Sequence, residues 1–350
     1  MKARTLAFLL MLCFSAGILF AQATPSPALL VLSKRDTSLA IVDPATLKVV
    51  ARIPSGPDPH EVVASADGKF AYVSNYGFGS YNTISVIDLV AQKALPAIDL
   101  GVLHGPHGLD FAGGKLYFTA EANKIIGRYD PASEKIDWLL GTGQNRTHMV
   151  AVSQDLNRIF TTNVNSGTVS IIDKSSAPAP GPAFGAPPGA PPSGPPAARP
   201  PDWNETIVPV GRGSEGFDVS PDGKELWAAN AQDGTISIID LASKKVVQTL
   251  DANIKGANRL KFTIDGKLAF VSSLFNGDVA IIDAATHKEV KRLKAGHGAA
   301  GILMQPDGAR VFIACSPDNN IAVVDLKTLE IVGRLETGAQ PDGMAWAVRQ

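Results

Sequence analysis

The stretch Ile84-Ser-Val-Ile-Asp88 decides the fold, because it recurs along the chain as an alternating apolar segment that ends in aspartate. The other copies end at Asp43, Asp130, Asp173, Asp240, Asp283 and Asp325. Successive aspartates lie 45, 42, 43, 67, 43 and 42 residues apart, so seven copies follow one period with a single long step. Alternation of apolar and polar residues predicts β-strands. Repeats of about 40–45 residues built from strands are typical of propeller blades.

Each repeat reads as four short strands. In the unit that begins at Pro59, residues 60–65 and 70–75 form the first two strands, and residues 84–88 and 94–100 form the last two. The turn between the first two contains Asp67-Gly68, and Asp-Gly recurs at residues 222–223, 265–266 and 307–308. Asp-Gly between apolar strands is a strong hairpin signal. The sequence therefore predicts an all-β, seven-bladed β-propeller with four antiparallel strands per blade.

The two ends of the repeat array are complementary. Residues 29–32 read as a second strand without a first, and residues 342–348 read as a first strand without a second. We therefore expect the last blade to be closed by N- and C-terminal strands, which removes an open sheet edge.

The long step of the repeat has a compositional cause. Residues 176–203 contain 11 Pro, 7 Ala and 4 Gly in 28 positions, a composition that cannot bury a core. We predict a disordered Pro/Ala/Gly-rich insertion there, within a single propeller domain that spans residues 24–350.

The N-terminus resembles an export signal. Lys2 and Arg4 precede an apolar run over residues 6–20, and Ala21-Gln-Ala23 is a small-x-small cleavage site. We expect residues 1–23 to be a signal peptide and the mature protein to be periplasmic or secreted. No other run is long enough for a membrane span, and Cys315 is the only cysteine beyond residue 23, so no intramolecular disulfide is expected.

The formal net charge of the chain is small, which argues against a nucleic-acid partner. Cleavage after Ala23 changes the formal net charge from −1 to −3, because two cations leave with the signal. Nucleic-acid binding needs clustered Lys and Arg, so we expect no nucleic-acid partner. We also expect no membrane insertion after cleavage, and a monomer.

The residues of the second strands carry a family resemblance. Tyr72-Val-Ser-Asn75, Ile159-Phe-Thr-Thr-Asn163 and Leu226-Trp-Ala-Ala-Asn230, with Ser220-Pro-Asp-Gly-Lys224, resemble the YVTN repeat over nearly all of the mature chain. The resemblance implies a seven-bladed β-propeller of the lactonase-like and cytochrome d1 haem-domain-like superfamily. It says little about function, because one fold hosts many chemistries.

The predicted starts of the first strands ring the mouth of the central channel. The aligned residues are His60, His107, His148, Glu215, Asn258, Ala300 and Asp342. Three imidazoles and a carboxylate suit a divalent metal such as Zn or Cu, which makes His60, His107, His148 and Glu215 candidate ligands. Imidazole also suits acid–base chemistry, with His148 or Glu215 as candidate catalytic bases. Alternatively, Arg146 and Arg259 could favour an anionic ligand, or the histidines only cap strands.

The ends of the second strands should surround this ring. The wider set of ligand-binding candidates adds residues from these ends and their loops to the ring itself: His60, His107, His148, Glu215, Asn75, Glu121, Asn163, Asn230, Arg259 and Asp342. For the asparagines, loop capping is the competing interpretation, because Asn bonds local backbone well.

These features favour a binding protein over a recognisable enzyme. We expect a small molecule, a metal or a protein segment to bind at the channel mouth. The alternative is a metal-dependent hydrolase or lyase of lactonase-like type, in which the metal polarises a carbonyl or activates water. A third possibility is a pure interaction scaffold. The cofactor stays unknown, and the absence of Cys-x-x-Cys-His argues against covalent haem.

Overall fold

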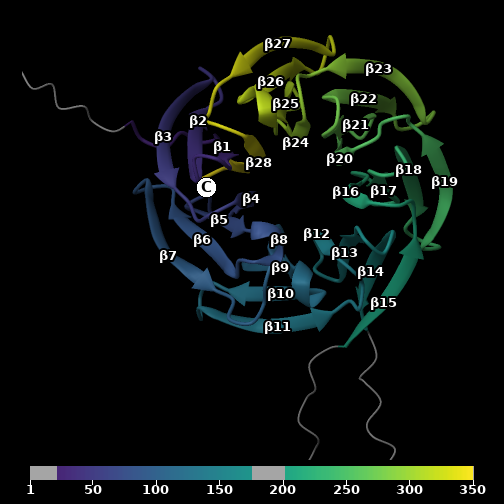
Figure 1. Cartoon of the computed structure of the whole chain (residues 1–350), viewed down its shortest axis with the longest axis horizontal. Coiled ribbons are helices and arrows are strands. Elements are labelled where there is room, and N and C mark those ends of the chain that lie inside the picture. The colour runs from purple at the N-terminus through teal and green to yellow at the C-terminus, as the bar shows by residue number, and fades with distance from the viewer. Residues whose placement is uncertain (1–21, 176–201, 350) are drawn as a thin grey trace, which may run out of the picture.

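The architecture is a ring of seven blades around a central axis. The computed structural model describes residues 22–175 and 202–349, and within them the chain forms seven four-stranded antiparallel sheets (Figure 1). The predicted seven-bladed β-propeller is confirmed. The predicted signal peptide (1–23) and insertion (176–203) fall, except for two residues each, outside the described residues.

The strands follow one another from the axis outward in every blade. Blade 1, the closing blade, has the order β28 (Pro341–Ala347), β1 (Ala28–Ser33), β2 (Ser38–Asp43) and β3 (Lys48–Pro54). Blade 2 holds β4 (Pro59–Ala64), β5 (Phe70–Asn75), β6 (Thr83–Asp88) and β7 (Lys93–Asp99), and blade 3 holds β8 (Pro106–Ala112), β9 (Lys115–Ala120), β10 (Ile125–Asp130) and β11 (Lys135–Gly141). Blade 4 holds β12 (Thr147–Val152), β13 (Arg158–Asn163), β14 (Thr168–Lys174) and β15 (Trp203–Pro209).

The remaining three blades repeat this order. Blade 5 holds β16 (Ser214–Val219), β17 (Glu225–Asn230), β18 (Thr235–Asp240) and β19 (Lys245–Asp251). Blade 6 holds β20 (Ala257–Phe262), β21 (Leu268–Ser273), β22 (Asp278–Asp283) and β23 (Lys288–Lys294). Blade 7 holds β24 (Ala299–Met304), β25 (Arg310–Cys315), β26 (Asn320–Asp325) and β27 (Glu330–Leu335). Three 3₁₀ turns, η1 (Gly77–Gly79), η2 (Glu121–Asn123) and η3 (Ser316–Asp318), follow second strands.

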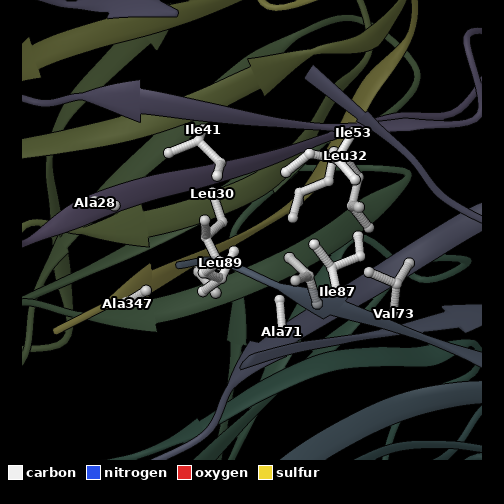
Figure 2. Packing of buried hydrophobic residues seen from close by; sticks show 13 residues of the cluster. Ala28, Leu30, Leu32, Ile41, Ile53, Ala71, Val73, Ile87, Leu89 and Ala347 are labelled. Carbon is white, nitrogen blue, oxygen red and sulfur yellow. The ribbon is translucent and has the colours of Figure 1, made fainter. Parts of the chain in front are cut away.

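The closing blade joins the two ends of the chain. β1 pairs antiparallel with β28, with Leu30 opposite Ala345, so the ring is closed by hydrogen bonds rather than by packing alone. Apolar side chains of this blade pack against Ala71 and Val73 of blade 2 (Figure 2). Leu30 and Ile41 are fully buried there. The closure expected from residues 29–32 and 342–348 is thus present in the structure.

Each inner strand carries a bulge just after its first residue. In β8 the pairing register with β9 shifts between Pro106 and Leu109, and in β12 and β16 it shifts at the equivalent position. In blades 2, 3, 4 and 6 a backbone N–H at the bulge donates to a hydroxyl of the second strand. In blade 3, Thr119 Oγ1 accepts from the Gly108 N–H (2.9 Å) and donates to the His148 carbonyl of the next blade (2.7 Å). A bulge re-aims side chains, and here the hydroxyl fixes its position.

The same hydroxyl bridge recurs in other blades. Thr162 Oγ1 donates to the carbonyl of Glu215 (2.5 Å), and Ser272 Oγ donates to that of Ala300 (2.9 Å). Neighbouring inner strands approach so closely that a Cβ on Gly108 would lie 2.5 Å from the His148 carbonyl oxygen. The second residue of such a bulge is therefore a glycine, as in Gly108, or a residue whose side chain points along the channel, as in Arg259.

The insertion leaves the propeller through an ordinary hairpin. Lys174 of β14 pairs with Trp203 of β15, and the Ser175 N–H donates to the Asp202 carbonyl at 2.8 Å. The predicted insertion therefore overlaps the strand at its last residue, because Trp203 begins β15 and packs on Trp138 with ring centroids 5.6 Å apart. The two strands are already paired where the chain leaves and returns.

Because β14 and β15 are paired up to Ser175 and Asp202, we predict that the insertion is dispensable for folding. Replacing residues 176–201 by Asn-Gly would give a two-residue turn of the kind that antiparallel strands favour. We expect the midpoint of thermal unfolding to change by no more than about 2–4 °C, the shift that corresponds to about 1 kcal/mol in a domain of this size. Calorimetry of the two proteins checks this. Loss of cooperative unfolding in the shortened chain would show that the insertion contributes to the fold.

Candidate functional site

One cavity of about 330 Å³ lies at the mouth of the central channel. All seven first-strand residues that the repeat aligned contribute to its lining: His60, His107, His148, Glu215, Asn258, Ala300 and Asp342. Their common repeat position explains this, because each stands in or beside the bulge that opens its inner strand. The residues that the repeat aligns thus meet in one cavity, and their roles stay predictions.

His148 is the centre of the most closely bonded group. Its Nδ1 contacts Oε1 of Glu121, and its Nε2 lies 2.7 Å from Oε2 of Glu215. Carboxylate oxygens can only accept, so both ring nitrogens donate and the ring is an imidazolium. Arg146 extends toward the same two acids, with N···O distances of 3.4 Å to Glu121 and 3.3 Å to Glu215. Tyr76 completes the group, with its hydroxyl donating to Glu121 Oε2 at 2.5 Å.

The ionisation of this group follows from its contacts. Burial would lower the pKa of His148, but the carboxylates of Glu215 and Glu121 outweigh it and raise the pKa to about 9. Burial would likewise raise the pKa of Glu215, but His148 and Arg146 hold it at about 2. The pKa of Glu121 is also lowered against burial, chiefly by its hydrogen bond with His148. The four charges therefore stabilise one another over the neutral pH range.

His107 lies directly against this group but is bonded differently. Its ring centroid is 3.7 Å from that of His148, with a tilt of 32° between the planes. Its Nδ1 is buried and has no hydrogen-bond partner among the described residues. Burial and the cationic His148 lower the pKa of His107 well below its ordinary value, so the ring is neutral. It is a buried polar group in a cavity wall, with bonding capacity that the protein does not use.

His60 lies on the other side of His107 and is satisfied by the protein. Its Nε2 is 2.9 Å from Lys34 Nζ, which also donates to Asp342 Oδ2 at 3.1 Å. A lysine ammonium has no acceptor, so His60 Nε2 accepts and the ring is neutral. Burial lowers its pKa in the same direction. The ring centroids of His60 and His107 are 5.1 Å apart.

An ion pair across the channel forms the floor of the cavity. Arg259 of blade 6 donates to Glu61 of blade 2, and its second nitrogen lies 3.1 Å from the Met149 sulfur. Both charged residues line this cavity and also the adjoining lower part of the channel. Burial would lower the pKa of Arg259, but Glu61 and Asp342 raise it, so the guanidinium stays charged.

The predicted asparagines take no part in the cavity. Asn75, Asn163 and Asn230 are buried at second-strand ends, and each donates to a hydroxyl on the third strand of its own blade. The distance from Asn75 Nδ2 to Ser85 Oγ is 3.1 Å, and the other two contacts are 2.9 and 3.0 Å. These side chains bond within their own hairpins and are not among the residues that line the cavity, and their ligand-binding role stays a prediction.

The predicted metal ligands do not converge as a set of four. His60 faces Lys34, and Glu215 bonds the far nitrogen of His148. The described residues instead bring His107, Glu121 and His148 together, with one donor atom from each lying within 4.8 Å of the others. Glu121, foreseen only as a ligand-binding residue, thus replaces His60 and Glu215 in the candidate metal set.

Phe78, Leu274, Ser316 and Gln340 also line the cavity, and the repeat alignment gave no indication of them. They lie in loops between blades or after second strands, where the repeat alignment is weakest. Phe78 sits in η1 with a positive φ of 50° and is 82% exposed, although it contacts Tyr76 with ring centroids 5.4 Å apart. The flanking glycines at 77 and 79 indicate an unusual loop conformation. They do not indicate that the Phe78 side chain would line the cavity.

Comparison with solved structures shows the same fold over nearly the whole chain. A candidate 6-phosphogluconolactonase from Bacteroides uniformis has a TM-score of 0.71 at 16% identity, covering 92% of this chain and 99% of the other. A functionally unknown protein from Desulfotomaculum acetoxidans has a TM-score of 0.71 at 13% identity, with coverages of 93% and 100%. The dihydro-haem d1 dehydrogenase NirN has 0.61 at 15%, with coverages of 92% and 75%.

The fold is that of the lactonase-like and haem d1 propellers. This confirms the resemblance carried by the second strands at the level of architecture. No protein-family model and no curated protein sequence matches the chain. Within the described part of the chain, no helix has the length and apolar character that crossing a bilayer requires.

The bonding of His148 predicts a pH-dependent contribution to stability. Its pKa is higher in the folded state, so the stabilisation is complete below its ordinary value of 6.5 and is lost as pH rises through about 9. We expect His148→Gln to lower the free energy of unfolding by about 3–5 kcal/mol at pH 6, because two buried carboxylates lose their partner. The deficit should shrink as pH approaches and passes 9.

Denaturant unfolding at a series of pH values measures this deficit. His297→Gln is the matched control, since the His297 side chain is 82% exposed and its ion pair with Asp318 lies at the surface. We expect that variant to stay within about 1 kcal/mol of the wild type. A His148→Gln deficit that is constant between pH 6 and pH 10 would contradict the assigned imidazolium.

Proposed function

We propose that this protein is an exported binding protein that holds a small molecule in the cavity at its channel mouth. The observation that carries the proposal is His107, whose buried Nδ1 lacks a partner among the described residues while its ring lines the cavity. Unsatisfied buried polar groups are rare and call for an explanation. A ligand that turns the His107 ring toward the cavity and bonds its Nδ1 supplies one.

The shape of the cavity supports a small-molecule ligand. Its volume of about 330 Å³ lies at the lower end of the range of roughly 300–1,000 Å³ for such sites. The ion pair of Arg259 with Glu61 closes it below, so a ligand would enter from the face that carries η1. The surrounding network holds the polar groups in place before binding, which reduces the cost of ordering them.

Export and a monomeric state complete the proposal. The charged start, the apolar run and the Ala21-Gln-Ala23 site support cleavage of a signal at the N-terminus. The closing blade leaves no unpaired inner edge where β1 meets β28, which removes one route to association through strands. We propose a soluble protein of the periplasm or the exterior, without a nucleic-acid partner.

A fragment screen tests the binding role. Protein labelled with ¹⁵N-histidine is exposed to a library of small polar fragments, and binding is read from the imidazole resonances. We expect fragments that shift the His107 signal, and we expect His107→Ala to weaken their affinity by about 5- to 150-fold, the loss that corresponds to 1–3 kcal/mol. His297→Ala, on an exposed ring, is the control. A screen that moves no His107 signal would reject the role.

A second candidate function is that of a metal-dependent hydrolase or lyase. One observation favours it: His107, Glu121 and His148 offer an acid and two imidazoles within 4.8 Å. Such a set suits Zn²⁺ or Cu²⁺, and the ion would polarise a carbonyl or activate water. The candidate 6-phosphogluconolactonase from Bacteroides uniformis, which has this fold, adds support for a lactonase-like reaction.

The fit of a metal to these residues demands rearrangement. Ligand atoms around Zn²⁺ can be no more than about 4.2 Å apart, so the set would have to contract. His148 would have to release one of the two ring protons that it donates, one to Glu121 and one to Glu215. At pH 7, with its pKa about two units higher, that release weakens apparent metal affinity by about a hundredfold.

Elemental analysis distinguishes this candidate. If it holds, protein incubated with Zn²⁺ or Cu²⁺ and desalted retains one ion per chain. His107→Ala and Glu121→Gln should both lose the ion, whereas His297→Ala should keep it. Retention in all variants, or in none including the wild type, would reject the metal site.

A further inference from the structure

We infer that the ligand of this cavity is an uncharged molecule with a hydrogen-bonding head and an apolar end. The inference rests on the proposed small-molecule binding and adds the chemical class of the ligand. It follows from how the charges on the cavity wall are paired and from what lies at its rim.

Four of the charged groups on the wall form two closed pairs. Lys34 bonds Asp342 at 3.1 Å, and Arg259 contacts Glu61. Lys34 has a second bond to His60 Nε2, and Arg259 a second contact to the Met149 sulfur. Neither cation is a free binding site for an anion, and neither acid is free for a cation.

The remaining charged groups form a neutral set of four. His148 and Arg146 carry two positive charges, and Glu121 and Glu215 carry two negative charges, all within the contacts described above. Every charged side chain that lines the cavity therefore has an opposite partner. An ion of either sign would enter without a counter-charge or would have to break a pair.

The polar groups that remain available are uncharged. They are His107 and the neutral side chains on the wall, Tyr76, Asn258, Ser316 and Gln340; His60 is also neutral, but its ring already bonds Lys34 and Asp58. His60 is fixed as neutral by accepting from Lys34, and a protonated His107 would bury an unpaired N–H against the cationic His148, whose ring centroid is 3.7 Å away. A neutral imidazole both donates and accepts, so it bonds an amide, hydroxyl or carbonyl without a change in charge.

The cost of burying charge decides between ligand classes. An unpaired ion loses hydration that a site of closed pairs does not replace, whereas a neutral polar group loses far less and regains it through hydrogen bonds. The wall thus discriminates against ions of both signs. This discrimination needs no repulsive residue, only the absence of an unpartnered charge on the described wall.

The rim of the cavity is apolar on two sides. Phe78 of the η1 loop is 82% exposed, and Leu274, which follows β21 of blade 6, is 43% exposed. Both contribute to the lining. The Phe78 ring also lies beside the His60 ring, with centroids 6.3 Å apart, so the apolar rim adjoins the polar wall of the cavity. A ligand with an apolar end would cover these side chains while its head bonds His107.

A matched set of probes tests both parts of the inference. Benzamide, benzoate, benzylammonium and acetamide are titrated into ¹⁵N-histidine-labelled protein, and the His107 imidazole resonance is followed. We expect benzamide to bind with a dissociation constant about tenfold lower, or more, than either charged probe, because only it enters without an unpaired charge. Acetamide should shift the same signal at higher concentration.

Phe78→Ala tests the apolar rim. Since its side chain is exposed, the variant should fold, and we expect weaker binding of benzamide by about threefold or more, with acetamide unchanged. Val102→Ala, 80% exposed but not part of the lining, is the control and should bind both probes as the wild type does. Equal losses for benzamide and acetamide would overturn the role of the rim.

The outcomes separate this inference from the function on which it rests. Benzoate or benzylammonium binding at His107 as tightly as benzamide would overturn the uncharged class and leave the site in place. No shift with any of the four probes, while the fragment screen does give His107 ligands, would overturn the class as well. If both experiments leave His107 unmoved, the binding function itself fails.

Discussion

The bulge at the start of each inner strand is the feature on which the site depends. It turns the following side chain toward the axis and frees a backbone N–H. In blade 3 the hydroxyl of Thr119 accepts that N–H and donates to the His148 carbonyl of blade 4, so one atom ties together the bulge and the neighbouring blade. Second-strand hydroxyls of this kind fix the backbone from which ring residues project, and side-chain contacts then fix the ring groups themselves.

The charge of each ring side chain depends on the residues that neighbouring blades place beside it. His148 carries a charge only because Glu121 and Glu215 flank it, and those acids come from blades 3 and 5. His107, held by the same type of bulge, has no such acid and stays neutral. Two histidines at the same repeat position thus differ in charge, and the difference comes entirely from neighbouring blades.

The sequence could predict whatever the repeat period encodes. Blade number, strand order, closure and the alignment of His60, His107 and His148 all follow from spacing, because each blade must present the same strand to the axis. The pairing of His148 with Glu121 could not be predicted, since it depends on the local twist of η2, outside the regular strands. The asparagines do recur with the repeat, but the period does not show that their side chains bond their own hairpins.

The side chains that line the cavity differ in size and polarity around the ring. Blades 2 to 5 present three imidazoles and a carboxylate, whereas blade 6 presents Asn258 and blade 7 only the methyl group of Ala300. A large side chain in place of Ala300 would occupy part of the cavity, because Ala300 lines it. The small Ala300 side chain and the unpartnered His107 Nδ1, both in this ring, are the two features on which the proposed ligand site rests.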